Sequence, residues 1–367
     1  MEPPKSRRRR GPFRAFKTLI YPLLCVGLGG VLLWILRPAP STSRAPIAAT
    51  VVLPTNAPAP KIVPSVASPP LAQTRASNES ASGTRPVETI LEAQIALARQ
   101  GISSGSIDGV AGYQTHSALM AFQQKQGITP SGVLNAQTKS ALQITLPAMT
   151  VYEVTSNDLA RLMPVPKTWL EKSEQPRLDF ENILELLGEK SFSNPKLIRA
   201  LNPSVNWSNV TAGTAVLLPR VQYPRTAARI ALLKISLEGR VLEGFDDASN
   251  LLLHFPCSIG RLAEKRPAGE LHVTVVALNP NYTFDPDVFP ESAEARQLGR
   301  KLIIPPGPNN PVGVAWIGLD RPGYGIHGTP APEQVGRTES HGCFRLANWN
   351  AEYLAKMAWV GMPVLVQ

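Results

Sequence analysis

The sequence predicts a multidomain chain that begins with a membrane-spanning helix and ends in a mainly-β domain. An uncharged apolar run lies near the N-terminus and a Pro- and Ala-rich stretch follows it. Short β-like runs separated by Gly, Pro and Asn fill the last third. With 367 residues the chain is long enough for two or three domains. Between the linker and the β-rich part, the patterns predict a small three-helix domain and then an α+β segment.

The positive charge of the chain is concentrated at its N-terminus. Nine Lys and Arg residues and a single acid lie within residues 1–44, whereas the whole chain carries a formal net charge of +10. The remainder is therefore close to neutral and offers no basic excess that would indicate nucleic-acid binding. We interpret residues 1–18 as a basic cytoplasmic tail.

Residues 19–36 contain no charged side chain and are just long enough to cross a bilayer as a helix. Because a positive flank stays in the cytoplasm, the rest of the chain is expected on the other side of the membrane. A cleaved signal peptide is the alternative, although the apolar run is long for one. Residues 37–86 are rich in Pro, Ala, Ser and Thr and lack aromatic residues, which predicts an unfolded, semi-rigid linker.

Residues 87–145 show the pattern of three short helices. Gly101 and Gly127 end the first two, and Asn135 caps the third. Three spaced elements carry a family resemblance: Ile107-Asp108-Gly109 with Gly112, Ala121-Phe122-Gln123 with Gly127, and Gly132-Val133-Leu134. In these residues the segment resembles the PGBD1 peptidoglycan-binding module. A plain three-helix linker without a ligand is the alternative.

Residues 148–225 are predicted as an α+β segment. A strand and a helix are expected at Val151–Val154 and Phe180–Gly188. The end of the segment, Leu197–Asn202 followed by Gly213–Pro219, resembles the end of a LysM glycan-binding repeat. Met163–Pro176 would interrupt that repeat. A structural spacer is the alternative.

Residues 228–367 are predicted as the mainly-β domain. Apolar β-like runs stand at Ile230–Ser236, Leu251–Ile259, Leu271–Leu278 and Val314–Leu319. One amphipathic helix, Asn350–Val360, and a final strand, Pro363–Val366, close the chain.

Cys343 has the neighbourhood of a reactive thiol. A thiol acts as a nucleophile through its thiolate, and a nearby histidine or cation lowers its pKa. His327 lies upstream as a candidate base, while His341 and Arg345 stand two residues to either side. Gly342 directly before the thiol lets backbone N–H groups approach an oxyanion closely. Spacing alone leaves open whether these groups converge.

Several other residues have structural interpretations. Cys257 is expected to be a small buried hydrophobe, and His254 and His272 to be structural residues of β-like runs. Trp316 and Trp359 are expected in the core. A loop with Tyr282 and Phe284 is a candidate cap for a cleft.

Two halves of a motif identify a catalytic family. They are Tyr324-Gly325-Ile326-His327-Gly328-Thr329 and Ser340-His341-Gly342-Cys343-Phe344-Arg345-Leu346-Ala347-Asn348. Further matches are Pro256–Gly260, Pro267–Glu270 and Pro305–Gly313. On these residues the C-terminal domain resembles the L,D-transpeptidase family of the YkuD/ErfK type, which implies a YkuD β-sandwich-like fold. Phe344, where Ile or Val is common, and Cys257, where Val is frequent, are small departures.

The resemblance implies roles for the motif residues. Cys343 would carry the acyl group and His327 would be the general base. His341 would support the site, and the amides of Gly342 and Cys343 would form the oxyanion hole. Arg345 would position the donor stem peptide and Asn348 would hold the loop. The remaining substrate-binding candidates are Ser340, Gly328, Thr329 and Tyr324.

The implied reaction is acyl transfer between peptidoglycan stem peptides. A Cys343 thioester forms with loss of D-alanine, and an amine of a second stem closes a 3→3 cross-link. No cofactor or metal is implied. Stem peptides, glycan and the membrane are the expected partners, and the catalytic domain is expected in the periplasm of a bacterium, anchored in the inner membrane.

Four alternatives stay open at this stage. Water in place of the amine would make the chain an L,D-carboxypeptidase or amidase, and a lipoprotein could be the acceptor. His327, His341 and Cys343 could instead hold zinc, although the acids nearby are only Glu333 and Glu339. The domain could also be a non-enzymatic scaffold that only binds stem peptides.

Overall fold

The computed structural model describes residues 83–225, 228–261, 266–288, 292–338 and 342–367. The predicted basic tail, the predicted membrane helix and most of the predicted linker lie outside these ranges. Within them, no helix is long and apolar enough to span a bilayer. The linker prediction ends too late, because Gly83–Pro86 form strand β1, which pairs with β2, Gln143–Leu146. Backbone pairing orders these four residues, and composition does not reveal it.

The first domain has the three predicted helices: α1, Ile90–Ala98; α2, Tyr113–Lys125; and α3, Ala136–Ala141. Two buried glutamines hold its turns in the same way. The side-chain oxygen of Gln94 accepts the N–H groups of Asp108–Gly109, and that of Gln123 accepts those of Ser131–Gly132. Each satisfied amide fixes a glycine turn from inside, since a buried polar group without partners would be costly.

The segment that follows is an α+β unit with its own apolar core. Its first strand, β3, pairs antiparallel with its last, β4. The elements are β3, Met149–Glu153; α4, Ser156–Ala160; α5, Trp169–Ser173; α6, Ile183–Ser191; α7, Pro195–Leu201; and β4, Ala215–Pro219. We call residues 148–225 the middle module. The stretch between α4 and α6, which contains α5, contributes Leu178 to a different core.

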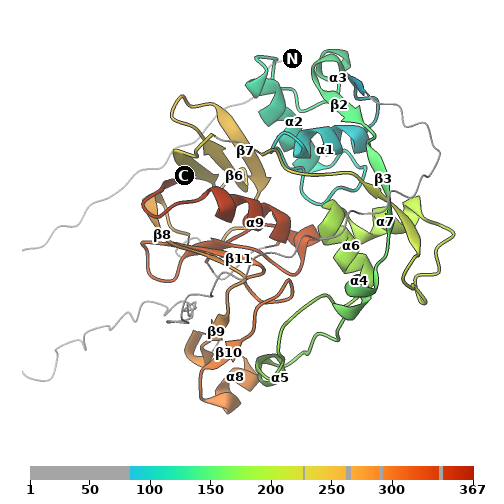
Figure 1. Cartoon of the computed structure of the whole chain (residues 1–367). Coiled ribbons are helices and arrows are strands. Elements are labelled where there is room, and N and C mark those ends of the chain that lie inside the picture. The colour runs from blue at the N-terminus through green and yellow to red at the C-terminus, as the bar shows by residue number, and fades with distance from the viewer. Residues whose placement is uncertain (1–82, 226–227, 262–265, 289–291, 339–341) are drawn as a thin grey trace, which may run out of the picture. The chain divides into compact units, whose positions relative to one another are not determined.

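The C-terminal domain is built on one eight-stranded mixed sheet in the order β13-β12-β11-β8-β14-β5-β6-β7 (Figure 1). Its strands are β5, Leu232–Ser236; β6, Val241–Phe245; β7, Leu251–Pro256; β8, Gly269–Leu278; β11, Ala315–Leu319; β12, Gly325–His327; β13, Phe344–Arg345; and β14, Pro363–Val366. The mainly-β prediction is confirmed. Strands β12 and β13 are too short to show a period-two pattern in the sequence.

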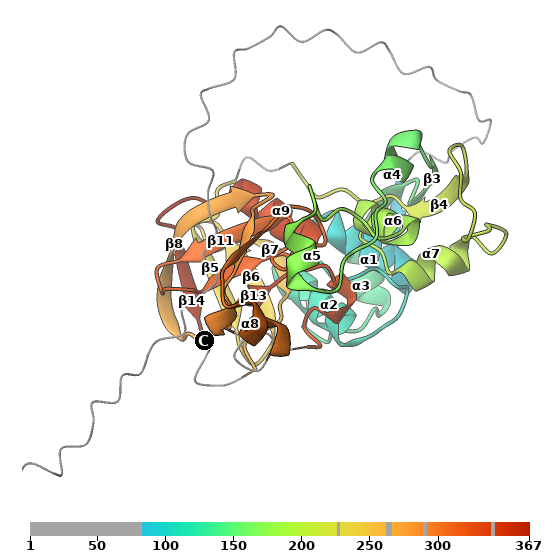
Figure 2. The ribbon, with the colours of Figure 1, turned by 90° about the horizontal axis from the view of Figure 1, so that it is seen from below.

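Strand β8 joins the two halves of this sheet. Its C-terminal part pairs with β11, and its N-terminal part pairs with β14. The two edge strands of the sheet, β7 and β13, come close to each other. Ser258, just after β7, exchanges two backbone hydrogen bonds of 2.9 Å with Arg345 of β13. The strands and helix α9, Asn348–Met357, therefore enclose one apolar core (Figure 2).

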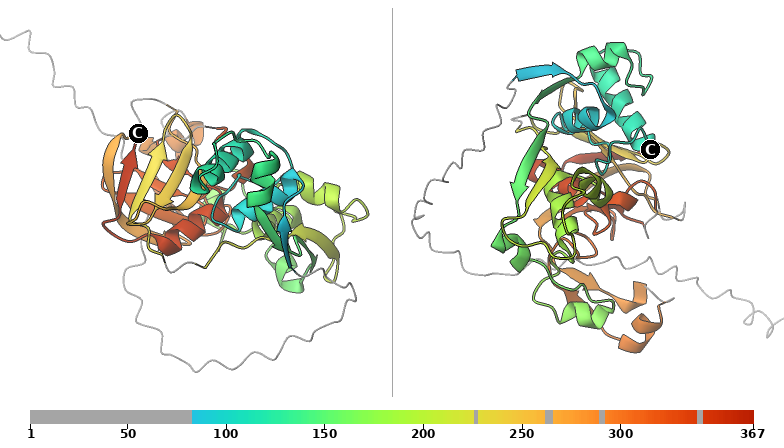
Figure 3. Two further views of the ribbon diagram at one scale, coloured as in Figure 1. Left: turned by 90° about the horizontal axis from the view of Figure 1, so that it is seen from above. Right: turned by 90° about the vertical axis from the view of Figure 1, so that its right-hand side faces the viewer.

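A small arm extends from the sheet between β8 and β11. It consists of β9, Tyr282–Phe284, α8, Ala293–Leu298, and β10, Leu302–Ile304, which pairs with β9. The predicted cap loop is thus a two-stranded sheet. Trp169 of α5 stacks on Phe284 with ring centroids 4.3 Å apart, and Glu294 accepts the Trp169 N–H at 2.6 Å. Figure 3 shows the green α5 beside this orange arm.

Candidate active site

The two halves of the motif meet as neighbouring strands. β12 and β13 are parallel, and their register pairs Ile326 with Phe344 and His327 with Arg345. Successive side chains of a strand point to opposite faces. Ile326 and Phe344 are fully buried in the core of the domain. His327 and Arg345 therefore point to the other face, away from that core.

Cys343 stands two residues before Arg345 in the sequence. Because side chains alternate between the two faces of an extended backbone, the thiol of Cys343 points to the same face as Arg345 and His327. The positive charge of Arg345 acts on the pKa of both Cys343 and His327, which agrees with this placement. Cys343 is half-buried and packs against the apolar cluster of the arm, which contains Tyr282. The structure thus places the predicted cation, Arg345, close to both the predicted nucleophile and the predicted base.

The ring of His327 is oriented by its own strand. Its Nδ1 lies 2.7 Å from the carbonyl oxygen of Gly328. A carbonyl can only accept, so Nδ1 carries the hydrogen and the neutral ring keeps a lone pair on Nε2. Trp316 of β11 stacks on the ring, with centroids 5.6 Å apart and planes at 24°. Nε2 is therefore the atom that can take a proton.

Burial dominates the electrostatics of this face. It lowers the pKa of His327 to about 4, with Arg345 lowering it further and the Gly328 carbonyl opposing. It raises the pKa of Cys343 to about 11, against a backbone hydrogen bond from Gly325 and the charge of Arg345. Burial also lowers the pKa of Arg345, against the charge of Cys343. At neutral pH the thiol and the imidazole are both neutral, so the expected lowering of the thiol pKa is not found.

Gly325 makes room for the aromatic wall of the site. A Cβ at this position would lie 2.6 Å from Cζ2 of the Trp316 indole. The Sγ of Cys343 donates to the carbonyl oxygen of Gly323 at 3.5 Å, just before this strand. The sequence identified Gly325 only as part of the motif and predicted Trp316 only as a core residue. Their role became visible because β11 lies beside β12.

Asn348 contacts the loop at residues 308–314. It is 2% exposed; its Oδ1 accepts the Val314 N–H at 3.3 Å and its Nδ2 donates to the Pro308 carbonyl at 3.2 Å. A Cβ on Gly328 would lie 2.3 Å from this Oδ1. Both residues had been grouped with the substrate-binding candidates. Their contacts are with the fold itself.

The other motif residues differ in how they are placed. Thr329 is buried and its hydroxyl accepts the Ala331 N–H at 3.4 Å. Tyr324 is half-buried, with the Arg321 guanidinium 4.8 Å from its ring centroid. Gly342 has a φ of 154°, which favours glycine. The remaining two, Ser340 and His341, lie outside the described residues.

Of the residues given structural interpretations, Cys257 and His254 are buried, whereas His272 and Trp359 are only partly buried. Cys257 is fully buried. His254 is 3% exposed and lies between Glu243 at 2.9 Å and Ser117 at 3.2 Å. The indole of Trp359 donates to the Ile230 carbonyl. In the described part of the chain, no three His, Cys, Asp or Glu side chains are grouped to hold a metal ion.

Comparison with known proteins adds the family. Residues 231–366 match the family described as "L,D-transpeptidase catalytic domain", YkuD, and residues 87–142 match the "Putative peptidoglycan binding domain". Residues 231–366 are thus an L,D-transpeptidase catalytic domain. That domain contains every described residue of the site above.

Similar curated proteins carry the same family name. The chain is 29% identical over 166 residues to "Putative L,D-transpeptidase YkuD" of Bacillus licheniformis, covering 45% of this chain and 81% of that protein. It is 35% identical over 117 residues to "Putative L,D-transpeptidase YqjB" of Bacillus subtilis, covering 30% of this chain and 57% of that protein.

Solved structures give a weaker comparison. An L,D-transpeptidase structure from Xylanimonas cellulosilytica is 15% identical, covers 80% of this chain and 100% of that one, and has a TM-score of 0.33.

Proposed function

We propose that this chain cross-links peptidoglycan by acyl transfer through Cys343 and forms 3→3 links between stem peptides. The observation that supports this best is the pairing of His327 with Arg345 across β12 and β13, with Cys343 directly before β13 and Arg345 acting on the pKa of both Cys343 and His327. The match of residues 231–366 to the L,D-transpeptidase family supports peptidoglycan cross-linking in general. The thioester and the 3→3 linkage are part of the proposal.

In the first step, the Sγ of Cys343 attacks the carbonyl of the third residue of a donor tetrapeptide. Because thiol and imidazole are both neutral, His327 Nε2 takes the proton during the attack rather than before it. Backbone N–H groups of Gly342 and Cys343 stabilise the oxyanion. The C–N bond then breaks, D-alanine leaves with the proton from His327, and a thioester remains.

In the second step, the side-chain amine of another stem attacks the thioester. His327 accepts the amine proton and returns it to the departing sulfur, which restores the neutral pair. Arg345 faces the same side as Cys343, and its cation suits a carboxylate of the donor stem. Tyr282, whose pKa is raised by burial and then by the charge of Cys343, lines the arm side of the thiol.

The N-terminal parts would keep the enzyme at its substrate. The domain at residues 87–142 is proposed to bind peptidoglycan. Its glycine turns carry exposed Val110 and Val133, with Tyr113 exposed beside the first. Residues 19–36 are proposed as an anchor in a bacterial inner membrane, which would leave the catalytic domain in the periplasm.

The test is incubation of the full chain with tetrapeptide muropeptides. Cross-linked dimers and free D-alanine are expected, and Cys343→Ala should form neither. A carbapenem should add its mass to the wild type and to Cys257→Ala, because Cys257 is fully buried, but not to Cys343→Ala. Tripeptide without dimers would instead identify an L,D-carboxypeptidase and overturn the cross-linking proposal. If lipoprotein is added to the same incubation, stem peptide attached to the lipoprotein in the absence of dimers would identify the lipoprotein as the acceptor.

A further inference from the structure

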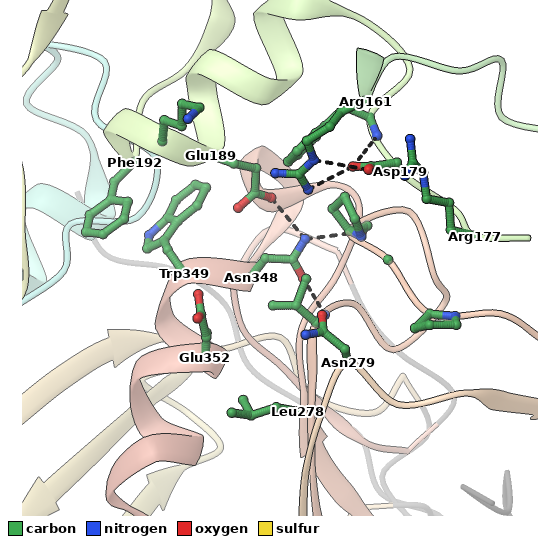
Figure 4. A pocket seen from close by; sticks show the side chains of 16 residues that line it. Arg161, Arg177, Asp179, Glu189, Phe192, Leu278, Asn279, Asn348, Trp349 and Glu352 are labelled. Atoms are coloured by element: carbon green, nitrogen blue, oxygen red, sulfur yellow. Dashed lines mark hydrogen bonds and ion pairs between the residues drawn. The ribbon is translucent and has the colours of Figure 1, made fainter. Parts of the chain in front are cut away.

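A cavity of about 490 Å³ lies where the middle module meets the catalytic domain. Helix α6 contributes Glu189 to its lining, and the start of α9 contributes Asn348. Figure 4 shows these two side chains turned toward each other and joined by a hydrogen bond. Cys343 does not line this cavity. The cavity therefore lies behind the catalytic face rather than in it.

A continuous line of contacts runs from this cavity to the candidate base. Asn348 Nδ2 donates to Glu189 Oε1 at 3.0 Å. Asn348 Oδ1 lies so close to Gly313 and Gly328 that a Cβ on either would be 2.0 or 2.3 Å from it. The carbonyl of Gly328 accepts Nδ1–H of His327 at 2.7 Å. The first and last links are hydrogen bonds, and the middle one is the close packing of Asn348 Oδ1 over Gly313 and Gly328. We therefore expect a shift of Asn348 to move the carbonyl that orients the imidazole.

The carboxyl of Glu189 has the chemistry of a neutral acceptor. Burial raises its pKa to about 8, against the Asn348 hydrogen bond, and the negative charges of Glu185, Glu352 and Glu333 add to the rise. A neutral acid offers its carbonyl oxygen to the amide of Asn348 without a buried charge. Glutamine offers the same oxygen in nearly the same shape, so it is the conservative replacement.

Helix α6 holds Glu189 in place. One turn earlier, Glu185 accepts from Asn309 Nδ2 at 2.6 Å, which ties the same helix to the catalytic domain. The Asn182 side chain caps the helix N-terminus, and Lys190 forms an ion pair with Asp158 at 3.3 Å. A partner on a rigid helix loses little conformational entropy when it forms its hydrogen bond.

We propose that Glu189 of the middle module is a positioning residue for His327, acting through Asn348 and Gly328. This inference rests on the proposed role of His327 as the base. It makes the middle module part of the support of the active site, because Asn348 Nδ2 would lack this partner in a catalytic domain cut free at residue 228. Glu189 lies outside the matched catalytic domain, residues 231–366.

The experiment compares Glu189→Leu, Glu189→Gln and the matched control Glu185→Gln in the full chain. The first readout is the NMR titration of the His327 ring in a Cys343→Ala background, which needs no catalysis. The second is the rate of carbapenem acylation with Cys343 intact. If wild type is not acylated, the proposed function fails, and the His327 titration still decides the positioning role.

We expect Glu189→Leu to shift the His327 titration and to slow acylation about tenfold, or about 1.4 kcal/mol. Glu189→Gln and Glu185→Gln should stay within about twofold of wild type. A folded Glu189→Leu with wild-type titration and rate overturns the proposal. So does a Glu189→Gln as slow as Glu189→Leu, or a Glu185→Gln equally slow.

A second variant guards against misfolding of Glu189→Leu. Glu189→Ala removes the acceptor without adding a branched apolar side chain, and it can be combined with Asn348→Ala in a double-mutant cycle. If Glu189 acts through Asn348, the double variant should be no slower than Asn348→Ala alone. Independent, multiplying losses in acylation rate would contradict the inference.

Discussion

His327 and Arg345 are paired directly across the parallel strands β12 and β13. The backbone of Arg345 is also held from its other side by two hydrogen bonds to Ser258. Arg345, two residues after Cys343, is thus fixed between β12, which carries His327, and the end of β7. This arrangement places the thiol by backbone pairing, which tolerates little displacement.

The neutral thiol–imidazole pair makes a prediction about pH. The pKa of His327 is about 4, so His327 is an unprotonated base above pH 4. The pKa of Cys343 is about 11, so Cys343 is a neutral thiol below pH 11. Acylation by a carbapenem should therefore change by less than about threefold between pH 5.5 and 9, and should fall at lower pH as His327 protonates. Stopped-flow acylation rates check this. A rise of about tenfold per pH unit across this range would show that a free thiolate is the reactant.

Gly325→Ala is expected to damage the site without unfolding the domain. The new Cβ would meet the Trp316 indole at 2.6 Å and push it from the His327 ring. Overpacking of this kind costs about 1–3 kcal/mol. We expect acylation to slow at least about tenfold. Gly112→Ala is the control, since a Cβ there meets nothing within 4 Å. Equal rates for the two variants would count against the close fit.

Trp169→Ala tests whether the middle module steadies the arm. The variant loses the stack on Phe284, and aromatic pairs contribute about 0.5–1.5 kcal/mol beyond buried area. Amide hydrogen exchange in β9 and β10 should become faster, because these strands would open more often. Trp207→Ala, in the same module but packed on its own core, should leave that exchange unchanged. If amide protection in β9 and β10 is unchanged in Trp169→Ala, the contact of Trp169 with Phe284 does not stabilise the arm.

Glu189 should make the stability of the protein depend on pH. Its folded pKa of about 8 exceeds the value of about 4.3 expected for an unfolded chain. Between these values the unfolded state releases a proton that the folded state keeps, so stability falls as pH rises through that window. Glu189→Gln removes this dependence. The melting temperature of Glu189→Gln minus that of wild type should therefore increase between pH 5 and pH 8.5.

The comparison that checks this melts Glu189→Gln and wild type side by side at each pH. Thermal melts at three pH values are sufficient. A Glu189→Gln advantage that does not change with pH would mean that the carboxyl ionises in the folded protein as it does in water.

Much of the fold was readable from residue patterns. Turn glycines and helix caps predicted the three helices of the first domain, and apolar runs predicted the strands β5, β7, β8, β11 and β14. The arm was read as a loop because β9 and β10 have three residues each and pair only with each other. Such short strands have no sequence periodicity to detect.

The sequence by itself determined the chemistry: a thiol, an imidazole and a guanidinium in a motif that identifies the family. The tertiary structure decided which faces those groups share and which protonation states they hold. Burial reversed the expected pKa shift of Cys343, because desolvation depends on every segment packed around the thiol. Tertiary packing also places Glu189 within hydrogen-bond distance of Asn348, which lies 159 residues away in the sequence. No local pattern encodes such a contact, since it forms only when helix α6 packs against the start of α9.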